Sequence, residues 1–574
     1  MKHPELYLLL TVFIITFSCA EEKKDSQIDY TKWEEFQGGP DRNQYSTLSE
    51  ITLDNVKDLK VAWSHSLPES GQMQMNPIIV DDILYGIGAD VRPFALNAAT
   101  GERIWIHGDP LKVWHSTSRG VTYFSKGADK RIYYSMGSHL YALDALTGEL
   151  ITDFADNGQL DLHKGLPEIA QDKFLVSNTP ATIYKDLIIV PLRMSESADA
   201  APGDIRAFNV LTGELVWTFH TIPYPGEEGY ETWENKNAYK NTNVGAVNNW
   251  CGMTIDRENG VVYIPLGSAS PDFYGGNRKG ANLYSDCLLA LNIETGEKLW
   301  HFQFTHHDIW DRDLPSTPNL IEVTREGKKI KAIAQVTKQG YVFVFNRFTG
   351  EPLFDIEEVP VPKSGINGEQ AYATQPIPTK PKPFARRSDE LTEADISPYA
   401  ENKEELLETF RKADKRFYAP PSEQPVLLLP GYDGGAEWGG AAADPEDGII
   451  YINSNEMAWL LTVKKTESIP SAAKSLGEQR YNDFCAVCHQ KDFSGSPESR
   501  VPSLLNPENK FNVAQMADLI DKGQGMMPGF PTLSITEKEE IAKYVLKLET
   551  DKQEVSSESS AYQDPYIHGD ITNF

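Results

Sequence analysis

Residues 289–300 read LALNIETGEKLW, and this order of apolar strand, Thr-Gly turn and closing aromatic decides the fold class. Five copies of the pattern occur in the chain, at Phe94–Trp105, Tyr141–Thr152, Ala207–Trp217, Leu289–Trp300 and Phe343–Phe354. Glycine at the turn permits the positive φ that a tight hairpin needs, and an aromatic four residues later can wedge between neighbouring sheets. Thr152 breaks this pattern in the second copy.

Apolar runs with a period of two lie between the copies and predict further strands. They include Ile78–Tyr85, Leu187–Val190, Val261–Ile264 and Ile449–Ile452. Because neighbouring copies are separated by about one four-stranded sheet, we expect an all-β propeller with four-stranded blades. A solenoid of strands is the alternative that the same repeats allow.

The repeats assign residues 28–466 to the propeller, with five full repeats and one partial blade at Gly439–Val463. Residues 356–430 lose this rhythm and are rich in proline, so we expect an irregular surface excursion with a helical stretch at Glu401–Phe417. Residues 472–549 have helical periodicity, which predicts a small all-α domain. Its expected helices are Ser475–Phe484, Val513–Lys522 and Thr536–Leu548. Residues 550–574 form a tail, polar from Asp551 to Ala561, and one interpretation of this tail is the start of a truncated return to the propeller.

Residues 1–19 predict an export signal and not a part of the fold. The nearly all-apolar run Leu6–Phe17 suits a signal peptide and is short for a membrane span. Cys19 follows it as in a lipoprotein signal, so we expect lipidation of Cys19 and anchoring at the periplasmic face of a membrane. A plain secretory signal with an incidental cysteine is the alternative.

The overall charge bounds the partners of the chain. The 574 residues include 54 basic and 83 acidic side chains, for a net charge of −29. Such a surface repels nucleic acid, which excludes that class of partner. A hydrophobic content of 40% excludes a polytopic membrane protein.

Residues 485–489 read CAVCH, which is the spacing of a covalent c-type haem site. The thiols of Cys485 and Cys488 can add to the two haem vinyl groups, and His489 then falls under the iron as an axial ligand. Met527, directly before Pro528, is the expected second axial ligand, with Met526 in reserve. The segment resembles class I cytochrome c domains. Two further cysteines, Cys251 and Cys287, are either a disulfide or two buried thiols.

Residues 304–315, FTHHDIWDRDLP, are too polar and too specific for a structural loop. With Lys338 in the sequence VTKQG, this segment resembles the pyrroloquinoline quinone (PQQ) dehydrogenases, and most of all their membrane glucose dehydrogenase branch. The resemblance runs from Trp33 to Val463. A haem domain joined to such a propeller is similar to the quinohaemoprotein dehydrogenases.

The resemblance implies roles for five residues around the cofactor. Asp311 matches the general base that takes the hydroxyl proton, and Lys338 matches the lysine that binds the quinone oxygens. Trp250 matches the floor under the flat cofactor, and Arg119 matches the arginine that pairs with a cofactor carboxylate. His115 falls where the glucose dehydrogenase branch has a histidine on the opposite ring face, which favours a sugar or polyol substrate. Further cofactor contacts are implied for Gln74, Glu437 and Trp438.

A divalent metal, calcium by the hardness of its oxygen ligands, is also implied by the resemblance. The matching ligands are Glu196, Ser268, Asp311 and Asp313. Most relatives have an Asn where this chain has Ser268, which puts the metal geometry in doubt.

These inferences lead to a PQQ-dependent dehydrogenase that oxidises a sugar, polyol or alcohol. We expect the electrons to pass to haem c and then to a quinone or another cytochrome. A haem-bearing carrier with a non-catalytic docking propeller is the alternative, and an outer-surface scaffold is a second one. Relatives of this kind have eight blades, so we also expect the sequence to be truncated or its missing blades to lie on another chain.

Overall fold

The computed structural model describes residues 28–573 with several gaps. The gaps are residues 69–70, 109–116, 172, 241–242, 466–474, 491–492, 496–501, 506–509, 524–526, 528–529, 531–532 and 549–565. Within the described helices and strands, the side chains of residues 479, 482–483, 487–488 and 567–573 are left aside. The predicted sites at Cys19 and His115, the reserve ligand Met526 and the side chain of Cys488 therefore lie outside the described part.

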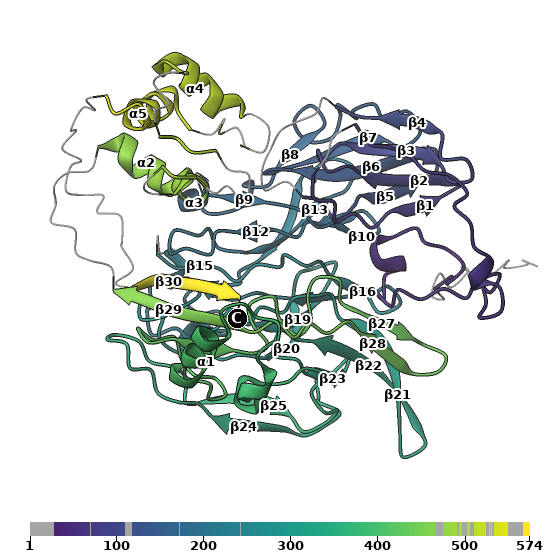
Figure 1. The fold of residues 1–574 in the computed structure, drawn as a ribbon. Helices are drawn as coiled ribbons and strands as arrows, with labels where there is room; N and C mark the ends of the chain where they lie inside the picture. The colour runs from purple at the N-terminus through teal and green to yellow at the C-terminus, as the bar shows by residue number, and fades with distance from the viewer. Residues whose placement is uncertain are drawn as a thin grey trace, which may run out of the picture.

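Four antiparallel four-stranded sheets follow one another along the first half of the chain (Figure 1). The first has β1 (Ile78–Val80), β2 (Ile83–Ile87), β3 (Pro93–Asn97) and β4 (Arg103–Ile106). The second has β5 (Thr122–Lys126), β6 (Asp129–Met136), β7 (His139–Asp144) and β8 (Gln159–Asp161). The third has β10 (Thr182–Tyr184), β11 (Leu187–Ile189), β13 (Ile205–Asn209) and β14 (Leu215–Phe219). The fourth has β16 (Thr254–Asp256), β17 (Val261–Pro265), β19 (Cys287–Asn292) and β20 (Lys298–Gln303).

Two shorter sheets continue this order. The fifth has three strands, β21 (Asn319–Arg325), β22 (Lys328–Val336) and β23 (Val342–Asn346). The sixth is a two-stranded hairpin of β27 (Ala441–Asp444) and β28 (Ile449–Ile452). The fifth repeat copy thus lacks a full fourth strand, although Phe345 forms an isolated bridge with Pro352.

The hydrophobic core lies between consecutive sheets. Tyr85 and Trp105 of the first sheet pack with Tyr134 of the second, and Trp300 of the fourth packs with Phe345 of the fifth. Further clusters join the second sheet to the third, the third to the fourth, and the fifth to β27 and β28. Sheets that bury both faces against their sequence neighbours are the blades of a propeller, and the predicted fold is confirmed.

The aromatic residue that closes each repeat seals one blade to the next. Trp300 lies over Gly350 so closely that a Cβ there would come within 2.7 Å of the indole, and its Nε1 donates to the carbonyl oxygen of Arg347 at 2.9 Å. The same relationship pairs Trp105 with Gly148 and Trp217 with Gly296. At Gly213, where Thr152 breaks the pattern, Phe154 and Ala155 fill the place of the tryptophan.

Trp63, which precedes the first repeat, has this relationship too. A Cβ at Gly101 would come within 2.4 Å of its indole, and its Nε1 donates to the carbonyl oxygen of Ala98 at 3.1 Å. The chain just before it carries large exposed apolar side chains, among them Leu53 and Val61. Trp63 therefore sits on the first blade as the closing residue of a preceding blade would.

The predicted run Ile78–Tyr85 is wrong as a single strand. It is a hairpin, because Asp81 and Asp82 adopt positive φ values of 49° and 64° between β1 and β2. Acidic residues tolerate the left-handed region better than β-branched residues, so the turn falls at the polar pair. The runs at residues 187–190, 261–264 and 449–452 correspond to β11, β17 and β28.

Smaller sheets decorate the blades. They are β9 (Leu175–Val176) with β12 (Arg193–Met194), β15 (Gly245–Ala246) with β18 (Ala269–Ser270), and β24 (Ile356–Pro360) with β25 (Thr374–Pro378). Residues 356–430 also contain helix α1 (Lys403–Lys412), shorter than the predicted stretch. Single 3₁₀ turns occur at Phe36–Gly38, Val56–Asp58, Glu168–Ala170, Tyr230–Thr232, Ala238–Lys240, Ser388–Glu390 and Glu393–Asp395.

A separate group of helices follows the sixth sheet (Figure 1). It consists of α2 (Leu476–Phe484), α3 (Ala486–His489), α4 (Val513–Lys522) and α5 (Ile535–Val545). Ser475, Asn512 and Ser534 cap three of these helices with their side-chain oxygens, which satisfies otherwise free backbone N–H groups. The predicted helices are therefore present to within three residues at each end.

The chain then returns to the propeller. Strand β30 (Tyr566–Asn573) pairs antiparallel with β29 (Trp459–Lys465), which in turn pairs with β26 (Val426–Leu428). The helical group is thus enclosed between two neighbouring strands of one sheet. None of the helices in the described part of the chain is long and apolar enough to span a membrane.

Candidate active site

The connections that lead into successive blades carry the predicted cofactor residues. Gln74 precedes β1, Arg119 precedes β5, Trp250 precedes β16, and Asp311 precedes β21. Glu437 and Trp438 precede β27, and Lys338 lies in the turn between β22 and β23. Because equivalent connections of a propeller meet at one end of its central channel, these distant residues can share one site.

Asp311 and Lys338 form an ion pair at this place. Lys338 Nζ donates to Asp311 Oδ1 at 2.8 Å, and the two side chains are only 6% and 20% exposed. Asp313 Oδ2 lies 3.9 Å from the same ammonium group, and Asp313 Oδ1 accepts from the backbone N–H of Ser268 at 2.5 Å. Asp311 itself has a φ of 55°, a left-handed conformation that costs free energy in a non-glycine residue.

The pKa values of both side chains in this pair are strongly shifted. Burial raises the pKa of Asp311 well above its ordinary value, and the nearby Asp313 adds to this effect, while Lys338 opposes it. Burial alone would lower the pKa of Lys338, but the carboxylates of Asp311, Asp313 and Glu437 outweigh it and raise that pKa. The site therefore holds a charged lysine beside a carboxyl group of increased basicity, which suits proton abstraction near neutral pH.

Arg119 lies between two indoles. Its guanidinium carbon is 5.3 Å from the ring centroid of Trp250 and 4.8 Å from that of Trp438. Its Nη1 donates to Thr179 Oγ1 at 2.6 Å and to the carbonyl oxygen of Trp250 at 3.3 Å. Burial lowers the pKa of Arg119 to about 10, which still leaves the side chain charged at neutral pH.

Several polar atoms of the predicted cofactor residues are unsatisfied. Trp250 Nε1, Arg119 Nε and Gln74 Oε1 are buried and find no hydrogen-bond partner among the described residues. Native proteins rarely leave buried polar atoms without a partner, except where a ligand supplies one. Two indoles, an arginine and these free polar groups fit a flat, carboxylate-bearing cofactor such as PQQ.

Two residues that the sequence reasoning missed lie near Asp311. Burial raises the pKa of Asp272 well above its ordinary value, and the nearby charges of Asp311, Glu196 and Asp313 raise it further. The hydroxyl group of Tyr432 is buried without a partner in the described part of the chain, and its electrostatic neighbours include Arg312 and Asp311. The sequence Ser-Pro-Asp at residues 270–272, directly after the predicted Ser268 turn, was the available signal for Asp272.

The predicted metal ligands come together only in part, because Asp311, Asp313 and Ser268 are neighbours but are engaged in other contacts. The Glu196 side chain is 71% exposed and lies 3.5 Å from Arg193. Ser268 Oγ donates to Asp308 Oδ2 and lies 3.2 Å from Asp286 Oδ1, so its hydroxyl group already has partners. Among the described residues, no group of three or more His, Cys, Asp or Glu side chains is arranged to hold a metal ion. Calcium at this place stays a prediction.

The helical group carries the predicted haem residues. Cys485 ends α2 and is buried, and His489 ends α3 with its ring 6% exposed. His489 Nδ1 lies 3.0 Å from the carbonyl oxygen of Pro502, which places the proton on Nδ1 and leaves Nε2 as the ring nitrogen for an iron. Burial lowers the pKa of His489 and so favours the neutral, metal-binding form. Met527 packs against the same apolar cluster as Cys485.

The two remaining cysteines are now assigned. Cys251 and Cys287 are both fully buried, and both are free thiols. Burial raises the pKa of each well above the usual thiol value, so both stay protonated. Of the two alternatives drawn from the sequence, the pair of buried thiols is confirmed.

Comparison with known proteins decides the family. Residues 33–499 match the family model described as glucose/ethanol/alcohol dehydrogenase, beta-propeller domain, which is the PQQ family. The chain belongs to the PQQ-dependent dehydrogenase family. Residues 472–545 of this PQQ-family chain also match a model described as cytochrome c oxidase, cbb3-type, subunit III.

Curated relatives of the PQQ family give the range of similar proteins. The chain is 31% identical over 455 residues to the quinoprotein glucose dehydrogenase of Escherichia coli, which covers 73% of this chain and 55% of that protein. It is 31% identical over 460 residues to the glycerol dehydrogenase large subunit of Gluconobacter thailandicus, covering 75% and 61%. It is 29% identical to the quinate/shikimate dehydrogenase (quinone) of Acinetobacter baylyi, covering 76% and 57%. The chain thus spans little more than half the length of these relatives.

A solved structure agrees on the fold. The quinohemoprotein alcohol dehydrogenase from Comamonas testosteroni superposes with a TM-score of 0.60 at 23% identity, covering 79% of this chain and 62% of that one. This PQQ-family chain therefore has the expected propeller, and the resemblance inferred from its sequence is confirmed.

Proposed function

We propose that this chain is a PQQ-dependent dehydrogenase that oxidises a hydroxyl compound and passes the electrons to its own haem c. The observation that carries the proposal is the buried ion pair of Lys338 and Asp311, at 2.8 Å, next to a cradle of Trp250, Arg119 and Trp438. A docking surface has no use for a buried lysine-carboxylate pair or for unsatisfied polar atoms between two indoles.

The residues of the cradle hold the cofactor. Trp250 and Trp438 stack against its ring, since large flat rings gain free energy from such contact. Arg119 pairs with a carboxylate of the cofactor and in doing so satisfies its unpartnered Nε. PQQ, when bound, supplies a quinone that accepts two electrons.

Asp311 takes the proton of the substrate hydroxyl group. Its raised pKa makes it a stronger base than an ordinary carboxylate, and the ammonium group of Lys338 opposes the rise and so favours the ionised form. Lys338 stays charged and would donate hydrogen bonds to the quinone oxygens of the cofactor, which would position and polarise them. Both side chains are nearly closed to solvent, so these charges act at low effective dielectric.

Asp272 and Tyr432 select the substrate. Both contribute polar groups near Asp311, and the Tyr432 hydroxyl group is free to bind a ligand within the described structure. A compound with several hydroxyl groups can satisfy both residues, whereas a simple alcohol cannot. This supports a sugar or polyol as the substrate.

The helical group accepts the electrons. Cys485 and Cys488 would attach the haem, and His489 and Met527 would supply the ligands of its iron. Haem c, when attached, supplies a one-electron carrier between the propeller and an external quinone or cytochrome. Covalent haem and the apolar run at Leu6–Phe17 both support a place outside the cytoplasm, with Cys19 as the expected lipid anchor.

Haem reduction tests the proposal. The purified, haem-loaded chain would be mixed with PQQ, with and without Ca²⁺, and then with glucose, glycerol, quinate or ethanol while the haem spectrum is followed. We expect haem reduction that requires PQQ, and a loss of about 10²–10⁴-fold in its rate in Asp311→Asn. Asp186→Asn is the matched control, because Asp186 binds Lys126 at the same 2.8 Å in an exposed pair. A normal haem spectrum without PQQ binding would leave the chain as an electron carrier.

A further inference from the structure

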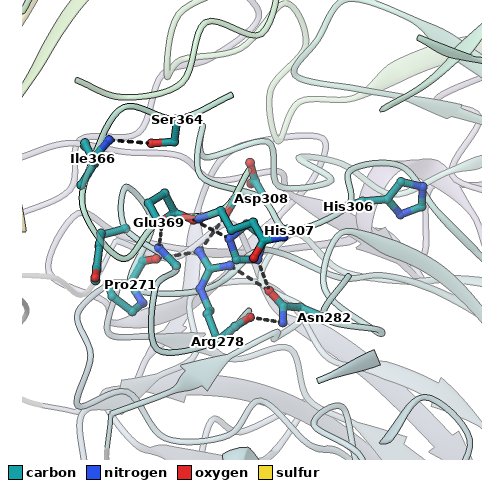
Figure 2. A network of polar contacts seen from close by, with 12 residues as sticks. Pro271, Arg278, Asn282, His306, His307, Asp308, Ser364, Ile366 and Glu369 are labelled. Carbon is teal, nitrogen blue, oxygen red and sulfur yellow. Dashed lines mark hydrogen bonds and ion pairs between the residues drawn. The ribbon is translucent and has the colours of Figure 1, made fainter. Parts of the chain in front are cut away.

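A buried polar network joins three segments that are far apart in sequence (Figure 2). Arg278 and Asn282 come from the connection between β18 and β19, and His307 comes from the connection that carries Asp311. Glu369 comes from the irregular excursion between β24 and β25. The side chains of His307 and Glu369 are 0% and 1% exposed, so this is a fully buried ionisable pair.

The hydrogen bonds of the network fix the orientation of His307. Glu369 Oε1 lies 2.8 Å from His307 Nε2, and Asn282 Oδ1 lies 3.0 Å from His307 Nδ1. Asn282 cannot be turned over, because its Oδ1 also accepts from Arg278 Nη1 at 3.0 Å and its Nδ2 donates to the carbonyl oxygen of Arg278. Both ring nitrogens of His307 therefore face oxygen acceptors, as a protonated imidazole requires.

Glu369 is held as a carboxylate. One of its oxygens accepts from the backbone N–H of Gly275 and the other from that of Gln370 at 2.6 Å. Burial opposes ionisation, but the hydrogen bond and charge of His307 outweigh it and lower the pKa of Glu369. A Cβ at Gly275 would come within 2.6 Å of the His307 ring, so the ring packs closely against this glycine.

The network continues directly to the candidate base. Arg278 Nη2 donates to the carbonyl oxygen of Asp308 at 2.5 Å and to that of Pro271 at 2.8 Å. Pro271 immediately precedes Asp272, and Asp308 lies three residues before Asp311. One guanidinium group thus ties the backbone ahead of Asp272 and Asp311, whose carboxyl groups influence each other electrostatically.

Asp308 then closes the loop that presents Asp311. Its carboxylate accepts from the backbone N–H of Trp310 at 2.9 Å and from that of Arg312 at 2.5 Å, on either side of Asp311. His307 and Asp311 both adopt positive φ values, of 46° and 55°. A loop with two left-handed non-glycine residues keeps this shape only where its surroundings impose it.

We propose that Glu369, acting through His307 and Arg278, is the positioning residue that sets Asp311 and Asp272 in place. The excursion at residues 356–430 is then part of the catalytic machinery, because it supplies the charge that orders the Asp311 loop. This inference rests on the proposed function for the role of Asp311, but the ordering of the loop does not.

Glu369→Gln in the full haem-loaded chain tests the proposal. We expect kcat for haem reduction to fall by about 10–100-fold, with KM and the Kd for PQQ each within about 3-fold of the unsubstituted chain, since misplacing a base removes an interaction made in the transition state. His307→Gln should have the same effect, and the double variant should be no worse than either single one. Glu369→Asp, which keeps the charge, should recover part of the rate.

Glu358→Gln is the matched control. Glu358 binds the adjacent histidine, His306, at 3.3 Å, but this carboxylate is half exposed. The control should leave kcat unchanged. A kcat for Glu369→Gln within about 2-fold of that of the control would overturn the proposal.

Amide hydrogen exchange distinguishes a failure of the positioning role of Glu369 from a failure of the proposed dehydrogenase function. Without cofactor or substrate, Glu369→Gln should speed amide exchange over residues 304–313 and 271–286, while Glu358→Gln should not. If no substrate reduces the haem but exchange increases, the proposed function fails and the positioning role stands. If exchange is the same in both variants, the positioning role fails whatever the activity. His307→Gln, which breaks the same contact from the other side, gives the same readout should Glu369→Gln not fold.

Discussion

The ammonium group of Lys338 lies 2.8 Å from the carboxylate of Asp311 across 27 residues of sequence. The turn between β22 and β23 and the connection after β20 meet here, and neither segment alone creates the pair. Lys338 is the one cation that counteracts the burial of Asp311 among the causes of its raised pKa. Lys338, which lies in a different strand connection, therefore tunes the protonation of Asp311, the candidate base.

Lys338→Met should move the acid limb of the kcat–pH profile to higher pH. Without the ammonium group the pKa of Asp311 rises further, because the group that opposes the rise is gone, so the base is ionised only at higher pH. The profile is measured at saturating PQQ, because Lys338 is also proposed to contact the cofactor. Lys126→Met, in the exposed pair with Asp186, should leave the profile unchanged. An acid limb at the same or lower pH would show that Lys338 does not tune Asp311.

Asp272→Asn should change how stability depends on pH. In an unfolded chain an aspartate has a pKa of about 3.9, and folding raises the pKa of Asp272 well above this. The folded state then holds more protons between the two values, so the free energy of unfolding falls as pH rises through that window. The variant lacks this loss and should have a higher Tm than the unsubstituted chain at pH 8, with a smaller difference at pH 4. Parallel curves, as expected for the exposed control Asp153→Asn, would contradict the assignment.

Trp300→Ala should destabilise the propeller by about 3–5 kcal/mol, since the indole is buried between two blades and donates to Arg347. Leu299→Ala, at the half-exposed neighbouring position, should cost less than about 1 kcal/mol. Urea unfolding followed by tryptophan fluorescence and by circular dichroism measures both. Equal costs would mean that the closing tryptophan does not seal the fourth blade to the fifth.

Met527→Ala should lower the haem reduction potential and alter the low-spin spectrum, because a thioether ligand is lost from the iron. Met526→Ala should leave both unchanged. The measurement is a redox titration of the haem absorbance. The reverse result would make Met526 the axial ligand, and no change in either variant would mean that neither methionine binds the iron.

Sequence patterns predicted the features that repeat. The Thr-Gly turns marked the blades, and the periodicity of the helical group gave α2, α4 and α5 to within three residues at each end. Thr152 showed where the pattern breaks, but not that Phe154 and Ala155 take over two residues later. The repeat pattern did not identify Trp63, because no Thr-Gly turn lies in the sequence before it.

Within the site, only residues that lie in a short, recognisable sequence motif were predictable. Asp311, Lys338, Trp250 and Arg119 stood out by their surroundings in sequence, and the structure brings them to one place in two contacting pairs. Glu369 lies 62 residues from His307 within an irregular segment, so no local pattern connects the two. Glu196 and Ser268 were assigned by position alone, and position could not show that one is exposed and the other bound to Asp308.

The pairing of β29 with β30 has a consequence for how the two domains are made and exchanged. Lys465 and Tyr566 are direct partners across the ladder, so the hundred residues between them leave and rejoin the propeller at a single point. A module attached in this way is exchangeable, because another domain whose own two ends lie close together can take its place without disturbing the sheet. It also imposes an order on synthesis. Strand β30 leaves the ribosome only after the whole helical module, so β29 gains this partner only once the module has been made.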